Sequence, residues 1–335
     1  MSSTFGNKLK ISIFGESHSE AIGVNIEGLP AGLIIDMDQL QKFMDRRAPG
    51  QSRFTTQRKE ADRPEFLCGI KNGVTEGTTV TAIIRNADTR SGDYDDMKDV
   101  PRPGHADFTA HIKYGGNEDY RGGGHFSGRL TAPLCIAGGI ALQMLEKKGI
   151  EIEAKIVEIG GNRDNPFEAI DEALKDGDSV GGVIQCTING VPAGIGEPMF
   201  DGIENRVAAA VFSIPAVKGI EFGRGFDAAR IRGSENNDEF YYDGDEVRTR
   251  TNNHGGILGG ITSGMPIVFK VAIKPTPSIS IEQNSISYSK HENVKLKVKG
   301  RHDPCIVPRA VPCIEAAAAL ALFDSMLDEG RCFER

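Results

Sequence analysis

The sequence predicts an α+β protein in which two β-sheets enclose a layer of buried helices. Two segments, 131–147 and 312–327, are apolar almost all round, which is typical of helices in the middle of a protein. Each follows a group of strand-like segments, without the regular strand–helix alternation of a doubly wound fold. Motifs of the first half also return in order in the second half. We therefore expect a β-α-β sandwich with an internal pseudo-two-fold duplication, as one domain over 1–335 with repeat halves at about 1–148 and 150–330.

The strands are predicted from β-branched or alternating apolar patterns. They cover 9–14, 24–26 and 79–85 in the first half, and 151–159, 183–188, 267–273 and 294–298 in the second. Two further segments, 38–47 and 203–211, carry their apolar side chains on one helical face. We expect both to be amphipathic helices.

The duplication rests on three motifs that recur in the same order. They pair 28–33 with 190–195, 73–77 with 260–264, and Arg129 plus 133–137 with Arg309 plus 312–316. A single Pro-Ala-Gly turn is common in proteins, so one match alone carries little information. Three matches in order favour an ancient duplication with loop insertions.

Composition excludes several classes of function. The chain has 39 basic and 47 acidic residues and a net charge of −8, which disfavours binding to nucleic acid or to an anionic membrane. Its uncharged apolar run at 130–145 is shorter than the roughly 20 apolar residues that span a membrane, and no signal-peptide pattern is visible. Six scattered cysteines form no Cys-x-x-Cys pair, and no His or Cys cluster has the spacing of metal ligands. We therefore expect reduced thiols, no metal and a cytoplasmic location.

Glycine is the outlier, with 41 of 335 residues, about 12% where about 7% is usual. Several glycines lie beside arginine or histidine, in 102–105, 121–125 and 127–129, and Arg301 lies beside His302. Segment 46–63 also holds six basic residues against two acidic ones. A solvated loop would explain that segment alone. Together, guanidinium forks and closely approaching backbone N–H groups predict a site for a small, multiply charged anion.

Two histidines are candidate general acids. His18 follows the strand predicted at 9–14, and His105 lies in a Pro-Gly turn beside Arg102. A lone histidine is more often structural, but two on glycine loops among arginines favour acid catalysis near neutral pH. The chain has no P-loop, no Rossmann fingerprint and no Gly-x-Ser-x-Gly elbow. The residues alone therefore predict an anion-binding enzyme and leave its reaction open.

These motifs resemble the chorismate synthase family over about residues 6–327. The resemblance rests on 15–18 (GESH), 45–47 (DRR), 52–58 (SRFTTQR), 102–107 (RPGHAD), 120–124 (YRGGG), 274–276 (KPT) and 300–305 (GRHDPC). It implies conversion of 5-enolpyruvylshikimate 3-phosphate to chorismate and phosphate, the last step of the shikimate pathway. The reaction is a 1,4-anti elimination that needs reduced FMN without net redox change. The resemblance also implies a β-α-β sandwich and a homotetramer.

The resemblance assigns a catalytic role to three residues. His18 would act as the acid beside the departing phosphate. His105 would protonate or electrostatically support the reduced flavin ring. Asp303 would remove the substrate proton, directly or through the flavin N5. NADPH would enter only as a source of reducing equivalents, through an external flavin reductase.

The resemblance also implies two sets of binding residues. The substrate set is Ser17, Arg46, Arg47, Arg53, Arg58, Arg102, Ser127 and Arg129. The flavin set is Arg47, Arg53, His125, Phe126, Ser127, Glu235, Asn236, Gly259, Lys274, Pro275, Thr276, Pro277, Ser278 and Arg301. An FMN-binding oxidoreductase without the elimination, and an anion-binding scaffold without catalysis, are the alternatives.

The chain departs from the family pattern at three places. Ser19 replaces the usual glycine after His18, and Ala48 replaces the third arginine of an Arg-Arg-Arg run. Residues 125–130 read HFSGRL where Arg-Ser-Ser-Ala-Arg-Glu is typical. Arg129 therefore survives, while a fixed cation becomes His125.

Overall fold

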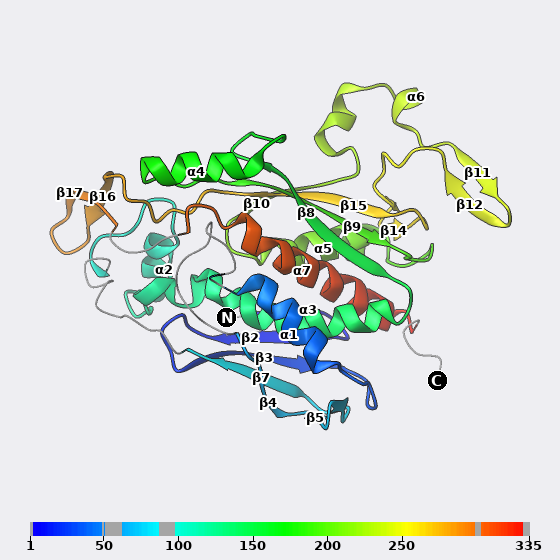
Figure 1. The fold of residues 1–335 in the computed structure, drawn as a ribbon, viewed down its shortest axis with the longest axis horizontal. Helices are drawn as coiled ribbons and strands as arrows, with labels where there is room; N and C mark the ends of the chain where they lie inside the picture. The colour runs from blue at the N-terminus through cyan, green and yellow to red at the C-terminus, as the bar shows by residue number, and fades with distance from the viewer. Residues whose placement is uncertain (1–2, 49, 51–61, 87–97, 299–302, 331–335) are drawn as a thin grey trace.

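Two antiparallel sheets enclose a layer of helices in the computed structural model (Figure 1). The structure describes residues 3–48, 50, 62–86, 98–298 and 303–330. Strands and helices are grouped into separate layers, so the predicted α+β sandwich with central buried helices is confirmed.

The first sheet has the strand order β1-β2-β3-β7-β4. Its strands are β1 (Thr4–Phe5), β2 (Lys10–Gly15), β3 (Ala21–Glu27), β7 (Val80–Arg85) and β4 (Glu65–Cys68). In the register, Val24 pairs with Ile13 on one side and with Ala82 on the other. Strands β2, β3 and β7 lie where the apolar patterns predicted them, and β2 and β7 both end next to the candidate site.

The second sheet has the order β10-β15-β9-β8. Its strands are β10 (Val217–Phe222), β15 (Ile267–Ile273), β9 (Gly182–Asn189) and β8 (Glu151–Ile159). In β15 the buried side chains alternate, with Phe269 and Val271 facing the core, because successive residues of a strand point to opposite faces. Strand β10 was not predicted, because only Val217 in it is buried and its pattern does not alternate.

Four helices lie between the sheets (Figure 1). They are α1 (Met37–Arg47), α3 (Thr131–Glu146), α5 (Ile203–Phe212) and α7 (Val307–Asp328). Helices α3 and α7 approach closely, since a Cβ on Gly138 would lie 2.3 Å from the Cβ of Ala316. Among the described residues, two helical stretches that include α3 and α7 are long and apolar enough to cross a membrane, but 89% of each is buried inside the protein. They form its core.

Helix α7 starts earlier than the sequence predicts. The sequence predicts this helix from residue 312, where the pattern that is apolar almost all round begins. In the structure the helix begins at Val307, Pro308 takes the place in the first turn, and Pro312 lies inside the helix. Pro312 has no N–H, so the Pro308 carbonyl lacks the hydrogen bond that an uninterrupted helix would give it.

The remaining elements lie outside these layers. They are α2 (Asp107–Tyr114), α4 (Pro166–Asp176), α6 (Gly233–Asn236), and the hairpins β5–β6 (Ile70–Lys71, Val74–Thr75), β11–β12 (Phe240–Asp243, Glu246–Thr249), β13–β14 (Ile257–Leu258, Ile261–Thr262) and β16–β17 (Gln283–Ser287, Glu292–Leu296). Helix α4 covers the second sheet, α2 and β16–β17 lie at one end, and α6 and β11–β12 project at the other (Figure 1). Strand β17 begins and ends two residues before the predicted 294–298.

The repeated motifs make the same hydrogen bonds in both halves. The hydroxyl of Thr75 donates to the Pro30 carbonyl (2.6 Å) and accepts from the Leu33 amide (2.9 Å). The hydroxyl of Thr262 donates to Pro192 (2.7 Å) and accepts from Ile195 (2.9 Å). Each threonine thus fastens the Pro-Ala-Gly turn of its own half. This correspondence supports the predicted duplication.

Candidate active site

The loop after β2 places His18 against a glycine turn. Ser17 is buried and its amide donates to the Gly124 carbonyl (3.1 Å), which joins the loop to residues 121–126. The His18 imidazole lies so close to Gly122 that a Cβ on that glycine would be 2.3 Å from the ring Cε1. The strand end therefore points His18 at this turn.

His105 lies against the neighbouring glycine of the same turn. A Cβ on Gly123 would be 3.1 Å from Nε2 of His105, so adjacent glycines contact the two histidines. Asp107 Oδ1 lies 2.5 Å from His105 Nδ1, and Arg102 Nε donates to Asp107 Oδ2 (2.7 Å). Burial raises the pKa of Asp107, but the hydrogen bonds from Arg102 and His105 outweigh it and hold this pKa well below its usual range. Asp107 therefore stays ionised and orients both partners.

The segment after β15 closes on the same residues. Lys274 Nζ donates to the Gly104 carbonyl (2.9 Å), and Arg102 Nη1 donates to the Ser278 hydroxyl (3.2 Å). Burial, with the nearby charge of Lys218, lowers the pKa of Lys274. The hydroxyl of Thr276 is buried and has no hydrogen-bond partner among the described residues. An acceptor or donor from a ligand could pair with it.

Two predicted anion-binding arginines share one carboxylate. Arg47 on α1 and Arg129 before α3 bind the two oxygens of Asp62, and all three side chains are buried. Arg47 also donates to the hydroxyl of Thr131 (3.2 Å). Burial raises the pKa of Asp62, but the charges of Arg47 and Arg129 outweigh it and lower this pKa. The carboxylate therefore fixes two guanidiniums side by side.

Further contacts extend this pair in both directions. On one side Arg129 Nε donates to Asn86 Oδ1 (3.2 Å), and the Asn86 amide donates to the Glu16 carbonyl (3.2 Å) in the His18 loop. On the other side Arg309 Nε donates to the Arg47 carbonyl (3.2 Å), and Arg309 Nη1 binds Asp303 (2.7 Å). A continuous series of contacts therefore runs from Asp303 through the arginines to the loop that carries His18.

Aspartates balance most of the cations at this site. Arg47, Arg102, Arg129 and Arg309 contact Asp62, Asp107 and Asp303, which leaves a net charge of +1 with the histidines neutral. The sequence predicts a strongly basic site, and Arg53, Arg58 and Arg301, which belong to that prediction, lie outside the described residues. Buried guanidiniums are costly without counter-ions, so the aspartates are what allow arginines here at all.

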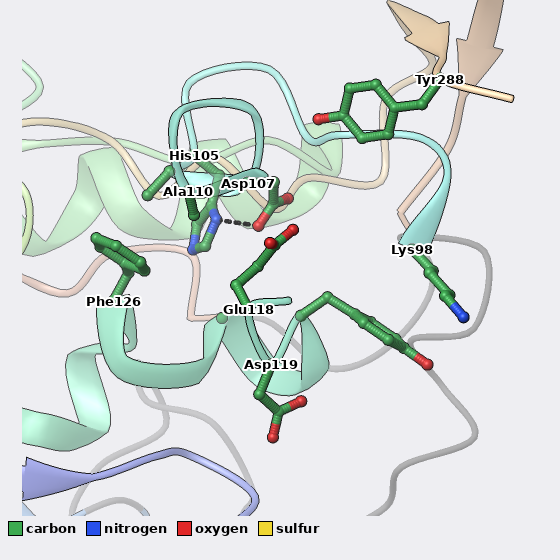
Figure 2. A pocket seen from close by; sticks show the side chains of 11 residues that line it. Lys98, His105, Asp107, Ala110, Glu118, Asp119, Phe126 and Tyr288 are labelled. Carbon is green, nitrogen blue, oxygen red and sulfur yellow. Dashed lines mark hydrogen bonds and ion pairs between the residues drawn. The ribbon is translucent and has the colours of Figure 1, made fainter. Parts of the chain in front are cut away.

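A pocket lies beside His105 (Figure 2). Phe126, Tyr120, Ala110 and Tyr288 line it together with charged groups. The carboxylate of Glu118 points toward Asp107 (Figure 2). The pocket therefore combines aromatic rings with the carboxylates of Asp107, Glu118 and Asp119 beside the imidazole.

Several predicted site residues lie elsewhere. Arg46 binds Glu315 through two hydrogen bonds (2.7 and 2.9 Å), on the side of α1 that faces α7 and β8. Glu235 and Asn236 belong to α6, at the opposite end of the protein from α2, and Gly259 lies between β13 and β14 (Figure 1). The structure therefore does not bring these four residues to the histidines. Arg53, Arg58 and Arg301 lie outside the described residues.

Two departures from the family pattern have structural consequences. The Ser19 hydroxyl lies 2.9 Å from the Glu16 carbonyl and accepts from the Glu16 amide (3.0 Å), so this serine braces the His18 loop. His125 Nδ1 lies 2.8 Å from the Gly15 carbonyl and Nε2 lies 2.6 Å from the Ser3 hydroxyl. His125 thus joins the turn to the end of β2. Ser127 accepts from the Arg129 amide (3.3 Å).

Sequence reasoning missed the residues that hold the arginines. In the sequence, Asp62 stands out only as an acid in a basic segment, and Asn86 belongs to none of the recognised motifs. Arg309 was noted only as the repeat of Arg129. Two signals could have identified these residues. Asp62 is an acid inside an arginine-rich segment, and Arg309 is the counterpart of the site residue Arg129 in the other repeat.

The fold and these contacts define a class of protein, an α+β enzyme with histidines and arginines around a candidate anion site. The model of the chorismate synthase family matches residues 9–327. The chain is 46% identical to the chorismate synthase of Korarchaeum cryptofilum (96% of this chain, 97% of that protein) and 48% identical to that of Chitinophaga pinensis (98% and 97%). A crystal structure of chorismate synthase superposes with a TM-score of 0.75 at 28% identity, covering 98% of this chain and 94% of the other. The chain belongs to the chorismate synthase family.

Proposed function

We propose that the protein is a chorismate synthase, a carbon–oxygen lyase that converts 5-enolpyruvylshikimate 3-phosphate to chorismate and phosphate. In this 1,4-anti elimination one C–H and one C–O bond break and a C=C bond forms. Phosphate leaves with the electron pair of the C–O bond, and a proton is taken up by a base. The observation that carries the proposal is the continuous series of contacts from Asp303 through Arg309, Arg47, Asp62 and Arg129 to the loop of His18.

The arginines are suited to hold the substrate's anionic groups. The substrate has one phosphate and two carboxylates, and a guanidinium carries five N–H donors, more than one carboxylate can accept. Arg47 and Arg129 are already oriented by Asp62. Because little side-chain entropy is left to lose, these guanidiniums bind a second anion at low cost.

Three residues act on the reacting bonds in this proposal. His18, held against Gly122, donates a proton or hydrogen bond to the departing phosphate. Asp303, held by Arg309 at 2.7 Å, accepts the substrate proton. His105, held by Asp107 and Arg102, stabilises charge at the flavin ring.

The residues around His105 fit reduced FMN. The unpartnered Thr276 hydroxyl and Lys274 offer groups for a phosphate, while Phe126, Tyr120 and Tyr288 line the pocket beside the imidazole. When bound, reduced FMN supplies an electron-rich ring that assists loss of phosphate without net oxidation. The protein's own part is to position this ring and to exclude water.

Three further properties belong to the same proposal. The enzyme is a homotetramer in the cytoplasm, and NADPH acts only as a source of reducing equivalents through an external flavin reductase. The tetramer is supported by the β11–β12 hairpin, which exposes Phe240 (65%), Tyr242 (78%) and Val247 (53%). Solvent-exposed apolar clusters of this kind are typical of subunit interfaces. Light scattering tests the assembly.

An anaerobic assay with chemically reduced FMN and the phosphorylated substrate tests the reaction. We expect release of phosphate together with the absorbance of a new diene. Flavin oxidation coupled to NADPH without phosphate release would identify an oxidoreductase. Tight binding of both ligands without turnover would identify a scaffold.

A further inference from the structure

Three consecutive glycines of the turn have left-handed backbones. Their φ and ψ angles are 58° and 17° at Gly122, 84° and 8° at Gly123, and 51° and −128° at Gly124. Residues other than glycine rarely adopt such backbone angles. Gly124 also packs against backbone, because a Cβ there would lie 2.1 Å from the Asp119 carbonyl oxygen. That contact explains Gly124, but neither of the other two.

At Gly122 the neighbouring atoms belong to His18. A Cβ would lie 2.3 Å from Cε1 and 2.5 Å from Nδ1 of the imidazole, and 2.8 Å from the Ser17 hydroxyl oxygen. The imidazole thus occupies the space that any side chain at 122 would need. The absence of that side chain determines how closely His18 approaches the turn.

At Gly123 the neighbouring atoms belong to His105. A Cβ would lie 3.0 Å from Cε1 and 3.1 Å from Nε2 of this imidazole, and 3.7 Å from Arg102 Nη2. These contacts are tight, but a shift of a few tenths of an ångström would relieve them. His18 therefore contacts Gly122 and His105 contacts Gly123, and a single peptide unit separates the two contacts.

Each histidine is also held by contacts outside the turn. Ser19 braces the His18 loop through the Glu16 backbone (2.9 and 3.0 Å). Asp107 holds His105 at 2.5 Å. Each ring is therefore supported from behind by its own loop and meets the glycine turn in front.

We propose that the Gly122–Gly123 peptide sets the relative position of the two histidines, with Gly122 positioning His18 and Gly123 positioning His105. Both glycines are positioning residues. The roles of the His18 and His105 imidazoles in the reaction are those of the proposed function, on which this inference rests. It assigns two adjacent residues to two different steps. Gly122 serves the departure of phosphate, and Gly123 serves the flavin side of the site.

The test compares Gly122→Ala with Gly123→Ala. Gly161→Ala is the control, because Gly161 has φ of 82° but no atom within 4 Å of its Cβ position. We expect kcat of Gly122→Ala to fall about 100-fold, the loss that a misplacement of about 1 Å causes, with an unchanged dissociation constant for FMN. Gly123→Ala should weaken FMN binding and lower kcat less. Equal effects of both variants on kcat and on FMN binding would overturn the proposal.

Imidazole NMR separates this proposal from the function on which it rests. The Cε1–H resonance of His18 should move in Gly122→Ala and that of His105 in Gly123→Ala, with neither moving in Gly161→Ala. These shifts need no substrate and no turnover, so they remain informative if the wild type fails the elimination assay. Movement of both resonances in both glycine variants, or of neither, would contradict separate positioning.

A pair of double variants covers the case in which Gly122→Ala unfolds. In a His18→Ala background, which removes the imidazole and leaves the Ser17 hydroxyl near a Cβ at 122, Gly122→Ala should lower the melting temperature much less than in the wild type. In a His105→Ala background its full effect should remain. The same large loss in both backgrounds would show that the Gly122 contact with His18 is not what excludes a side chain.

Discussion

Arg47 and Arg129, which are far apart in the sequence, bind the two oxygens of one buried carboxylate. That carboxylate belongs to Asp62, whose side chain is completely buried in this pair of contacts. Because desolvated guanidiniums depend on this charge, the stability of the site and its shape are coupled.

Removal of Asp62 should therefore destabilise the protein strongly. We expect Asp62→Ala to lower the free energy of unfolding by about 3–5 kcal/mol, the usual cost of leaving buried charges without their partner. Asp227→Ala is the control, since Asp227 and its partner Arg230 are both 70% exposed and such pairs contribute about 0–1 kcal/mol. Urea unfolding measures both, and similar small losses would contradict the importance of the buried carboxylate.

Acid should unfold the protein partly through the same carboxylates. The pKa values of Asp62 and Asp107 are lower in the folded protein than the ordinary value of 3.8. Their contribution to stability is therefore complete above the unfolded pKa and is lost as the pH falls through and below about 4. We expect the urea midpoint of the wild type to fall more steeply than that of Asp107→Asn between about pH 5 and pH 3. Parallel curves would show that Asp107 does not contribute.

Loss of the His18 imidazole should reduce turnover without unfolding the protein. We expect His18→Ala to release phosphate about 100 to 10,000 times more slowly, the usual contribution of a general acid. His291→Ala is a suitable control, because His291 is exposed in the turn after β16. Near-normal turnover of His18→Ala in the anaerobic assay would remove this residue from the mechanism.

The contact between α3 and α7 should not tolerate a larger residue at Gly138. A Cβ there would lie 2.3 Å from the Ala316 Cβ and 2.5 Å from its Cα, so the helices would have to separate. We expect Gly138→Ala to cost about 1–3 kcal/mol, as overpacking usually does. Gly233→Ala, a helical position with no atom near its Cβ position, should instead be neutral or stabilising by about 0.5–1 kcal/mol. Thermal melts distinguish the two.

Most of the core could be predicted from the sequence, because its signals are local. Strands β9 and β15 show their buried faces as a repeat of two, and α3 is apolar on every side. The start of α7 was missed, because Arg309 precedes the apolar run that predicted residues 312–327. The hairpin β16–β17 was predicted poorly, because only two of its residues are buried and its pattern is weak.

The sequence by itself determined the two-sheet architecture, the repeated turns fastened by Thr75 and Thr262, and the set of arginines and histidines that carry the family resemblance. Only the tertiary structure decided which of them meet. Arg46 and Arg47 are neighbours in the chain, yet Arg46 binds Glu315 and Arg47 binds Asp62. Consecutive residues of a helix point about 100° apart, so adjacent arginines face different neighbours. Which neighbour each one finds depends on segments that are distant in the sequence.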